Sequence, residues 1–291
     1  MPLSGKSPGD RLESAAASLG DGPGEDAATR AAAVHVVDKY VRSGSVVALG
    51  TGQVTGNIFD YLKDCVDVKL LKDIKILPTS DVAASEAAFH GLPQTSIGET
   101  DEVDVLFQEV DEIDTASGTF ISGRQAEPHQ PQLMKARLAA KRAKEVVALL
   151  QTETKAERLG GWLPVVIEGD NWEDIAEEID TIFLGDAEIW RRPTEGTANP
   201  RGGNNPYLSP EGHNIIDIRF DGTLKLYGEE VEYEKISNEI MAVAGVVTHG
   251  LFLNTATATL TIKSDGPVVE TLVNKHGFSF LWDAGGFSMS E

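Results

Sequence analysis

Hydrophobic and polar positions in the first part of the chain change between helical spacing and short apolar runs. Residues 26–41 (DAATRAAAVHVVDKYV) place apolar side chains at helical intervals behind Asp26, which can cap a helix, and residues 45–50 (SVVALG) are typical of a short buried strand. A turn rich in small residues follows at 51–56 (TGQVTG), and helical spacing resumes over 57–66. Helix, strand, glycine turn and helix in this order predict the start of a doubly wound α/β sheet.

The same pattern continues through two further strands. Strands are expected at 75–81 (KILPTSD) and at 103–114 (VDVLFQEVDEID), the second running into an acidic turn, with a helix at 82–91 between them. Residues 134–150 (MKARLAAKRAKEVVALL) predict one strong helix with a cationic face. Together these elements predict a doubly wound layer of strands covered by helices.

A second group of predicted strands and helices begins after Gly160-Gly161. The predicted strands are 162–168, 214–220, 246–254 and 257–263, and the predicted helices are 171–183 and 234–245. A loop dense in Gly, Pro and Asn separates them at 191–214. Strand and helix therefore alternate over 163–253, which predicts a small α+β layer distinct from the first domain.

Composition narrows the classes of partner. The chain has 291 residues, with 25 Lys and Arg against 46 Asp and Glu, a net charge of −21. This charge argues against nucleic acid and against an anionic membrane surface as partners. No run of 18 apolar residues occurs, so no membrane insertion is expected, and residues 1–25 lack the apolar core of a signal peptide and predict a disordered arm. The one cysteine, Cys65, excludes an intramolecular disulfide and favours a reducing compartment.

Two segments have residues suited to chemistry. GTGQVTG at 50–56 lies where a strand leads into a helix, so its N–H groups could hold a phosphate, although a plain tight turn is equally consistent. QEVDEID at 108–114 places four carboxylates after a strand, a pattern that suits proton transfer or else a solvated acidic loop. A metal there would need histidine support, and only His129 is nearby, so neither metal nor cofactor is expected.

Several segments together resemble the ribose-5-phosphate isomerase A family, from Asp26 to Val273. The similar segments are VRSGSVVALGTGQVTGNIFDYL, LPTSDVAASEAAFHGLP, DVLFQEVDEID, LGGWLPVVIE, EGHNIIDIRF and IMAVAGVVTHGLFLN. The resemblance implies an α/β fold, with a Rossmann-like domain (26–162 plus 254–273), an inserted ferredoxin-like α+β domain (163–253) and a C-terminal extension (274–291). It also implies a homo-oligomer. The family interconverts ribose 5-phosphate and ribulose 5-phosphate through an enediolate without metal or nucleotide.

The catalytic motifs of the family are altered here. In its D-G-A-D-E motif the first aspartate is catalytic, and the resemblance places Gln108 at that position, while Asp111 and Glu112 match. Glu109 stands in place of the motif's glycine. An amide cannot replace a carboxylate base, and the loss of one catalytic group lowers a rate by about 10²- to 10⁴-fold.

A second motif, K-G-G-G followed by a catalytic glutamate, falls on residues 119–130. Ile121 takes the position of the catalytic lysine, only Gly123 of the glycines is kept, and Gln130 lies where the glutamate is expected, with Glu127 three residues away. An isoleucine cannot stabilise an oxyanion.

The substrate-binding positions are better preserved. The family's G-T-G-S-T phosphate loop becomes GTGQV, which loses two hydroxyl donors to Gln53 and Val54. The residues that the resemblance assigns to substrate binding are Arg30, Gly50, Thr51, Gly52, Gln53, Thr79, Ser80, Asp81 and Lys155.

Two functional hypotheses follow, besides a third idea, a sugar-phosphate isomerase of altered specificity. The first is a divergent isomerase homologue that has lost most of its catalysis and acts as a sugar-phosphate binder or as a subunit of a larger assembly. The second is an active isomerase with a rearranged loop, in which Glu127 is the base and Arg124 the cation beside Asp111 and Glu112. Either would fit the cytosol or the plastid stroma.

Overall fold

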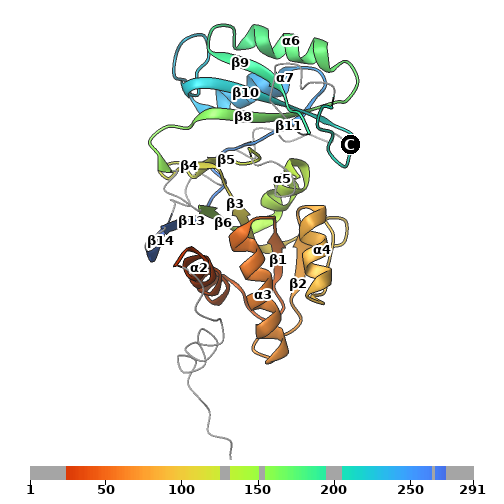
Figure 1. Ribbon diagram of the computed structural model, residues 1–291, viewed down its shortest axis with the longest axis vertical. Coiled ribbons are helices and arrows are strands. Elements are labelled where there is room, and N and C mark those ends of the chain that lie inside the picture. Colours follow the sequence, from red (N-terminus) through yellow and green to blue (C-terminus); the bar gives the residue numbers. More distant parts are fainter. Residues whose placement is uncertain (1–23, 125–131, 151–154, 195–204, 264–265, 273–291) are drawn as a thin grey trace, which may run out of the picture.

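The computed structural model describes residues 24–124, 132–150, 155–194, 205–263 and 266–272. The described elements form three sheets, stacked along the long axis of the molecule (Figure 1). The large helix-covered sheet lies at one end, a four-stranded antiparallel sheet at the other, and a small sheet containing β4 and β5 between them.

The large sheet has six strands in the order β14-β13-β6-β3-β1-β2. Its strands are β1 (Val46–Leu49), β2 (Lys75–Pro78), β3 (Val103–Glu109), β6 (Ala143–Leu150), β13 (Ala258–Lys263) and β14 (Gly266–Leu272). All pairings are parallel except that of β13 with β14. The helices of this part are α2 (Gly24–Tyr40), α3 (Gln53–Asp67), α4 (Asp81–Phe89) and α5 (Leu133–Arg142).

Side chains on the two faces of this sheet enter separate apolar clusters. Leu49 and Phe107 pack with residues of α2 and α3, whereas Ala48 and Leu106 pack with residues of α5. Successive strand residues point to opposite faces, so neighbouring positions serve different helices. The expected Rossmann-like, doubly wound layer is therefore confirmed.

The expectation of one helix over 134–150 was wrong. The helix ends at Arg142, and residues 143–150 form β6 between β3 and β13. Every side chain from Val146 to Leu150 is fully buried. A strand covered on both faces has no polar alternation, so its apolar run resembles a continuation of the preceding helix.

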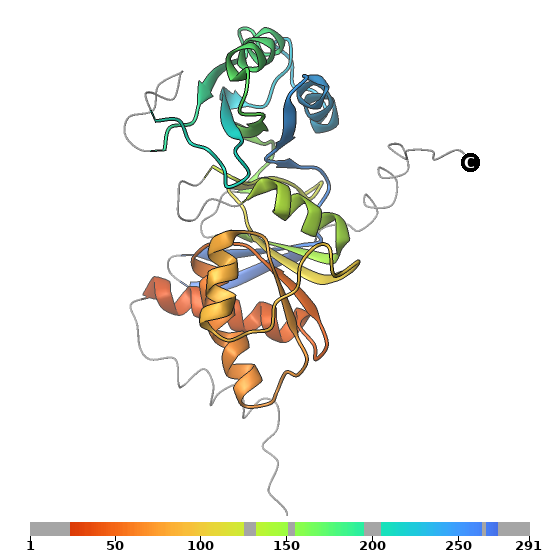
Figure 2. The same ribbon diagram turned by 90° about the vertical axis from the view of Figure 1, so that its right-hand side faces the viewer.

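The antiparallel sheet has the order β11-β8-β10-β9. Its elements in chain order are β8 (Gly160–Ile167), α6 (Trp172–Ile182), β9 (Ala187–Arg191), β10 (Asn214–Thr223), α7 (Tyr233–Ala242) and β11 (Val246–His249). This β-α-β-β-α-β order is ferredoxin-like, as expected. Figure 2 shows both helices on the face of the sheet that is turned away from α5 and the large sheet.

The third sheet was not predicted. It consists of β12 (Leu251–Phe252), β5 (Thr119–Ile121), β4 (Glu112–Asp114) and β7 (Lys155–Ala156), in that order. The expected acidic turn after β3 is thus partly a strand, and the single strand expected at 246–254 is divided between two sheets. The division falls at Gly250, where a Cβ atom would lie 2.2 Å from the Ser122 carbonyl oxygen.

The ends of the chain and the domain limits add little to the site. Most of the predicted arm (1–25) and all of the predicted extension (274–291) lie outside the described residues, and α2 begins at Gly24, inside the predicted arm. The proposed domain boundaries stay a prediction. Within the described ranges, no helix combines the length and the apolar character needed to cross a membrane.

Candidate functional site

The candidate site lies at the carboxyl ends of β1 and β3. β1 is the neighbour of both β2 and β3, so the chain passes from β1 to β2 on one side and returns to β3 on the other. A reversal of this kind opens a crevice beyond the strand ends, where open α/β sheets bind ligands. The loop after β1 and the acidic segment after β3 meet at this point.

The loop after β1 is occupied by a side chain of β3. Helix α3 starts at Gln53, earlier than expected, and its N-cap residue, Gly52, has φ of 148°. The Glu109 Oε1 atom accepts hydrogen bonds from the backbone N–H groups of Val54 (2.7 Å) and Thr55 (3.1 Å), and Glu109 is only 4% exposed. A Cβ atom on Gly52 would lie 2.0–2.2 Å from the Glu109 carboxylate group. The carboxylate therefore lies directly on the glycine turn, at the N-terminus of the helix.

Gln108 lies beside this loop. It is 1% exposed, and its Nε2 donates to the Ser122 hydroxyl (3.1 Å) and to the Glu109 carbonyl (3.1 Å). Its Oε1 has no hydrogen-bond partner among the described residues. This oxygen lies 3.4 Å from the point that a Cβ atom on Gly50 would occupy, as does the Thr79 hydroxyl. The buried amide thus faces the start of the loop.

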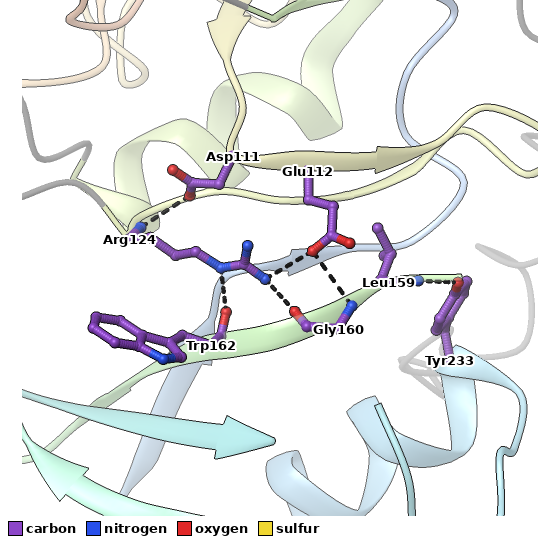
Figure 3. Close-up of polar contacts among 7 residues, drawn as sticks. All are labelled: Asp111, Glu112, Arg124, Leu159, Gly160, Trp162 and Tyr233. Atoms are coloured by element: carbon purple, nitrogen blue, oxygen red, sulfur yellow. Dashed lines mark hydrogen bonds and ion pairs between the residues drawn. The ribbon is translucent and has the colours of Figure 1, made fainter. Parts of the chain in front are cut away.

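Asp111, Glu112 and Arg124 form a second polar group (Figure 3). The Asp111 Oδ2 atom accepts the Arg124 backbone N–H at 2.9 Å. The Arg124 guanidinium donates to Glu112 (3.0 Å) and to the carbonyls of Gly160 and Trp162 on β8. The guanidinium thus connects β4 with β8.

The pKa of Asp111 reflects its surroundings. Burial raises this pKa above its ordinary value, and the N–H group and charge of Arg124 offset the effect only in part. A raised pKa suits a group that moves protons, but the loss of solvent around Asp111 accounts for it without any catalytic role.

The residues after β2 have mainly structural contacts. The Thr79 hydroxyl donates to the Leu49 carbonyl (3.2 Å), and the Ser80 hydroxyl accepts the Ala83 N–H (3.0 Å) as the N-cap of α4. Asp81 is exposed and pairs with Lys135 of α5 (2.8 Å), whose hydrogen bond lowers the pKa of Asp81.

The remaining candidate residues are divided between the described and undescribed parts of the chain. Thr51 is buried, Gln53 is exposed, and Arg30 is a partly buried residue of α2. The backbone of Lys155 pairs with β4, but its side chain lies outside the description, as do Glu127, His129 and Gln130.

Comparison with known proteins identifies the family. The sequence model described as ribose 5-phosphate isomerase A (phosphoriboisomerase A) matches residues 75–266. The chain belongs to this family. Ribose-5-phosphate isomerase A of Synechococcus sp. (strain JA-3-3Ab) is 28% identical over 243 residues, which cover 83% of this chain and 95% of the relative.

Solved isomerase structures share the fold. Ribose 5-phosphate isomerase from Plasmodium falciparum has a TM-score of 0.73 at 24% identity, covering 86% of this chain and 99% of the other. Ribose 5-phosphate isomerase A from Methanocaldococcus jannaschii has a TM-score of 0.69 at 21% identity, covering 84% and 98%.

The strand geometry separates the two residues that precede Gly123. Ile121 is fully buried in the apolar core of the ferredoxin-like layer, with Leu163 and Leu251. The next residue, Ser122, follows the end of β5, and its hydroxyl accepts a hydrogen bond from the Gln108 amide. The side chain that faces the crevice before Gly123 is therefore Ser122, which carries no charge.

Sequence reasoning missed the contacts of two arginines, one of which contacts the Gly123 carbonyl. Arg192 (8% exposed) forms a bidentate ion pair with Asp217 and donates to the Gly123 carbonyl at 2.8 Å. Arg137 of α5 donates to the carbonyls of His249 (2.6 Å) and Leu251 (2.9 Å), between β11 and β12. No local sequence signal indicates the contacts of either arginine, since each contact joins segments distant in the chain.

The described residues contain no group of three or more His, Cys, Asp or Glu side chains arranged to hold a metal ion. That no metal or cofactor is required stays a prediction.

Proposed function

We propose that this chain is a catalytically impaired member of the ribose-5-phosphate isomerase A family, acting as a sugar-phosphate binder or as a subunit of a larger assembly. The observation that carries the proposal is Gln108. Its position at the end of β3 corresponds to the first aspartate of the D-G-A-D-E motif, and its amide is buried and bonded to Ser122 and to the Glu109 carbonyl.

Proton transfer between two carbons of an open sugar needs a base beside both carbons. A carboxylate can accept that proton, whereas an amide has no basic electron pair at neutral pH. The Gln108 amide is further held by its two hydrogen bonds, so it acts as a structural link between β3 and Ser122.

The enediolate also needs a positive group at its developing oxyanion. The two guanidiniums whose charges act on Asp111 are those of Arg124 and Arg192. Arg124 bonds Glu112 and two carbonyls of β8, and Arg192 bonds Asp217 and the Gly123 carbonyl. Each of these cations is thus already engaged with protein acceptors.

The alternative is an active isomerase with Glu127 as base and Arg124 as cation. Glu127 lies outside the described residues, and the contacts of Arg124 give this role no support.

A coupled assay of ribose 5-phosphate conversion by the purified full-length chain tests the proposal. We expect turnover at least about 10²-fold below the 1–10³ s⁻¹ typical of enzymes, because position 108 carries an amide in place of the carboxylate base. Gln108→Asp, which restores a carboxylate, is the informative variant, and Gln94→Asp is a control on the surface of the same domain. Wild-type turnover in the ordinary range would refute the impairment.

The partner and the compartment belong to the same proposal. A homo-oligomer or a mixed complex is expected, and light scattering after size-exclusion chromatography measures which of them forms. The acidic charge of −21 favours partners with basic surfaces, in the cytosol or the plastid stroma.

A further inference from the structure

The turn between β1 and α3 has the features of an anion site. Its backbone N–H groups at Val54 and Thr55 point to one oxygen, and the positive end of the helix dipole lies behind them. Gly52 has no side chain and φ of 148°, so an anion can approach the backbone closely.

The anion in this turn belongs to the protein. The Glu109 carboxylate accepts both N–H groups, and the Thr55 hydroxyl lies 3.4 Å from the same oxygen. The space that a Cβ atom of Gly52 would take is filled by the carboxylate. With the residue 4% exposed, the carboxylate is enclosed in the turn and not merely near it.

A second observation concerns the adjoining wall. The Gln108 Oε1 atom is buried without a partner among the described residues, and it lies 3.4 Å from the point that a Cβ atom on Gly50 would occupy. Buried acceptors without a partner are rare in folded proteins, so this oxygen marks a polar wall that can still accept a hydrogen bond.

We propose that Glu109 is a built-in anion that fills the phosphate-binding turn and excludes phosphate esters from it. The inference rests on one of the two roles in the proposed function, the subunit of a larger assembly, and speaks against the other, a sugar-phosphate binder. A phosphate would need the same N–H donors and would lie within a few ångströms of the carboxylate. Two anions so close in a site with little solvent repel each other strongly.

The proposal predicts different phosphate affinities for two variants of Glu109. Glu109→Ala removes the anion and opens the turn, so inorganic phosphate should bind at least about tenfold more tightly than to the wild type. Glu109→Gln removes the charge but keeps an oxygen for the N–H groups, and should gain less than Glu109→Ala. Asp64→Asn is the matched control, because it removes one negative charge from an exposed position of the same helix.

The test is a titration of the full-length chain with inorganic phosphate at constant ionic strength, followed by the amide resonances of Val54 and Thr55. These resonances should move saturably in Glu109→Ala and stay fixed in the wild type and in Asp64→Asn. Movement in the wild type, or a folded Glu109→Ala that binds no phosphate, would overturn the proposal. If Glu109→Ala fails to fold, Glu109→Gln decides: a gain supports the proposal and no gain overturns it. Isomerase turnover is measured separately, so either conclusion can fail without the other.

Discussion

The buried ion pair between Arg192 and Asp217 allows a quantitative prediction about how the ferredoxin-like layer is held to the site. The two side chains are 9% and 4% exposed. The guanidinium Nε donates to Oδ2 of Asp217 at 3.0 Å, Nη2 donates to Oδ1, and Nη1 donates to the Gly123 carbonyl at 2.8 Å. The pair therefore connects β10 with the backbone carbonyl of Gly123.

Arg192→Met keeps most of the aliphatic volume but removes every one of these donors. Breaking a buried pair on one side destabilises a protein by about 3–5 kcal/mol, because it leaves an uncompensated charge. The unpartnered Gly123 carbonyl adds about 1 kcal/mol or more. We therefore expect a loss of about 4–6 kcal/mol in the free energy of unfolding, measured by urea denaturation with tryptophan fluorescence.

Two variants separate the pair from its surroundings. Arg191→Met changes the preceding residue, whose guanidinium bonds Asn214 and lies over Trp172 in a less buried place, and should cost about 1–2 kcal/mol. The double variant Arg192→Met with Asp217→Leu removes both charges and should regain most of the loss. A cost for Arg192→Met below about 1 kcal/mol, or no recovery in the double variant, would show that the pair does not hold this junction.

Two other predictions concern the loop and a buried histidine. Gly52→Ala should lower the free energy of unfolding, measured by urea denaturation, by about 2–4 kcal/mol, because a Cβ atom would lie 2.0 Å from the Glu109 carboxyl carbon and because φ is 148°. Adding Glu109→Ala should restore the part of the loss that is due to the clash. An equal loss in the single and the double variant would contradict this explanation. Burial and a nearby charge hold the pKa of His249 well below 6.5, so only the unfolded chain gains this proton as the pH falls below 6.5. His249 therefore contributes stability above pH 6.5 that is lost as the pH falls, at up to about 1.4 kcal/mol per pH unit. His249→Gln should flatten this dependence in urea denaturation at a series of pH values, and an unchanged slope in His249→Gln would refute the assignment.

The order of elements was largely predictable from the sequence, and the exceptions have one physical cause. Residues 143–150 were assigned to a helix because a preceding helix and an unbroken apolar run have no Gly or Pro between them. Their strand conformation depends on β3 and β13, which are hydrogen-bonded on either side. The short strands β7 and β12 likewise exist through partners distant in the chain, β4 and β5, which local spacing does not reveal.

The location of the candidate site followed from the sequence, but its contacts did not. Glycines after β1 and carboxylates after β3 indicated one end of the sheet, where the structure brings these segments together. That Glu109 bonds an N–H group 55 residues earlier in the chain is a tertiary fact, and the motif only showed that its glycine had been replaced. Arg124 was a candidate cation because of its position, whereas its contacts with Glu112 and β8 depend on a sheet that the sequence did not indicate.

A glutamate at position 109 affects stability and ligand binding in opposite directions. Helix α3 has no capping side chain of its own, because its N-cap is Gly52. Glu109 supplies a permanent acceptor at that end, an interaction worth about 0.5–2 kcal/mol for a cap together with a favourable dipole term. In a turn that binds a substrate phosphate, the same stabilisation is present only while the substrate is bound. The glutamate thus makes the stability of the loop independent of ligand. This benefits a protein that acts through contacts with a partner more than a protein that must bind and release a sugar phosphate. Of the two roles in the proposed function, this argument favours the subunit of an assembly.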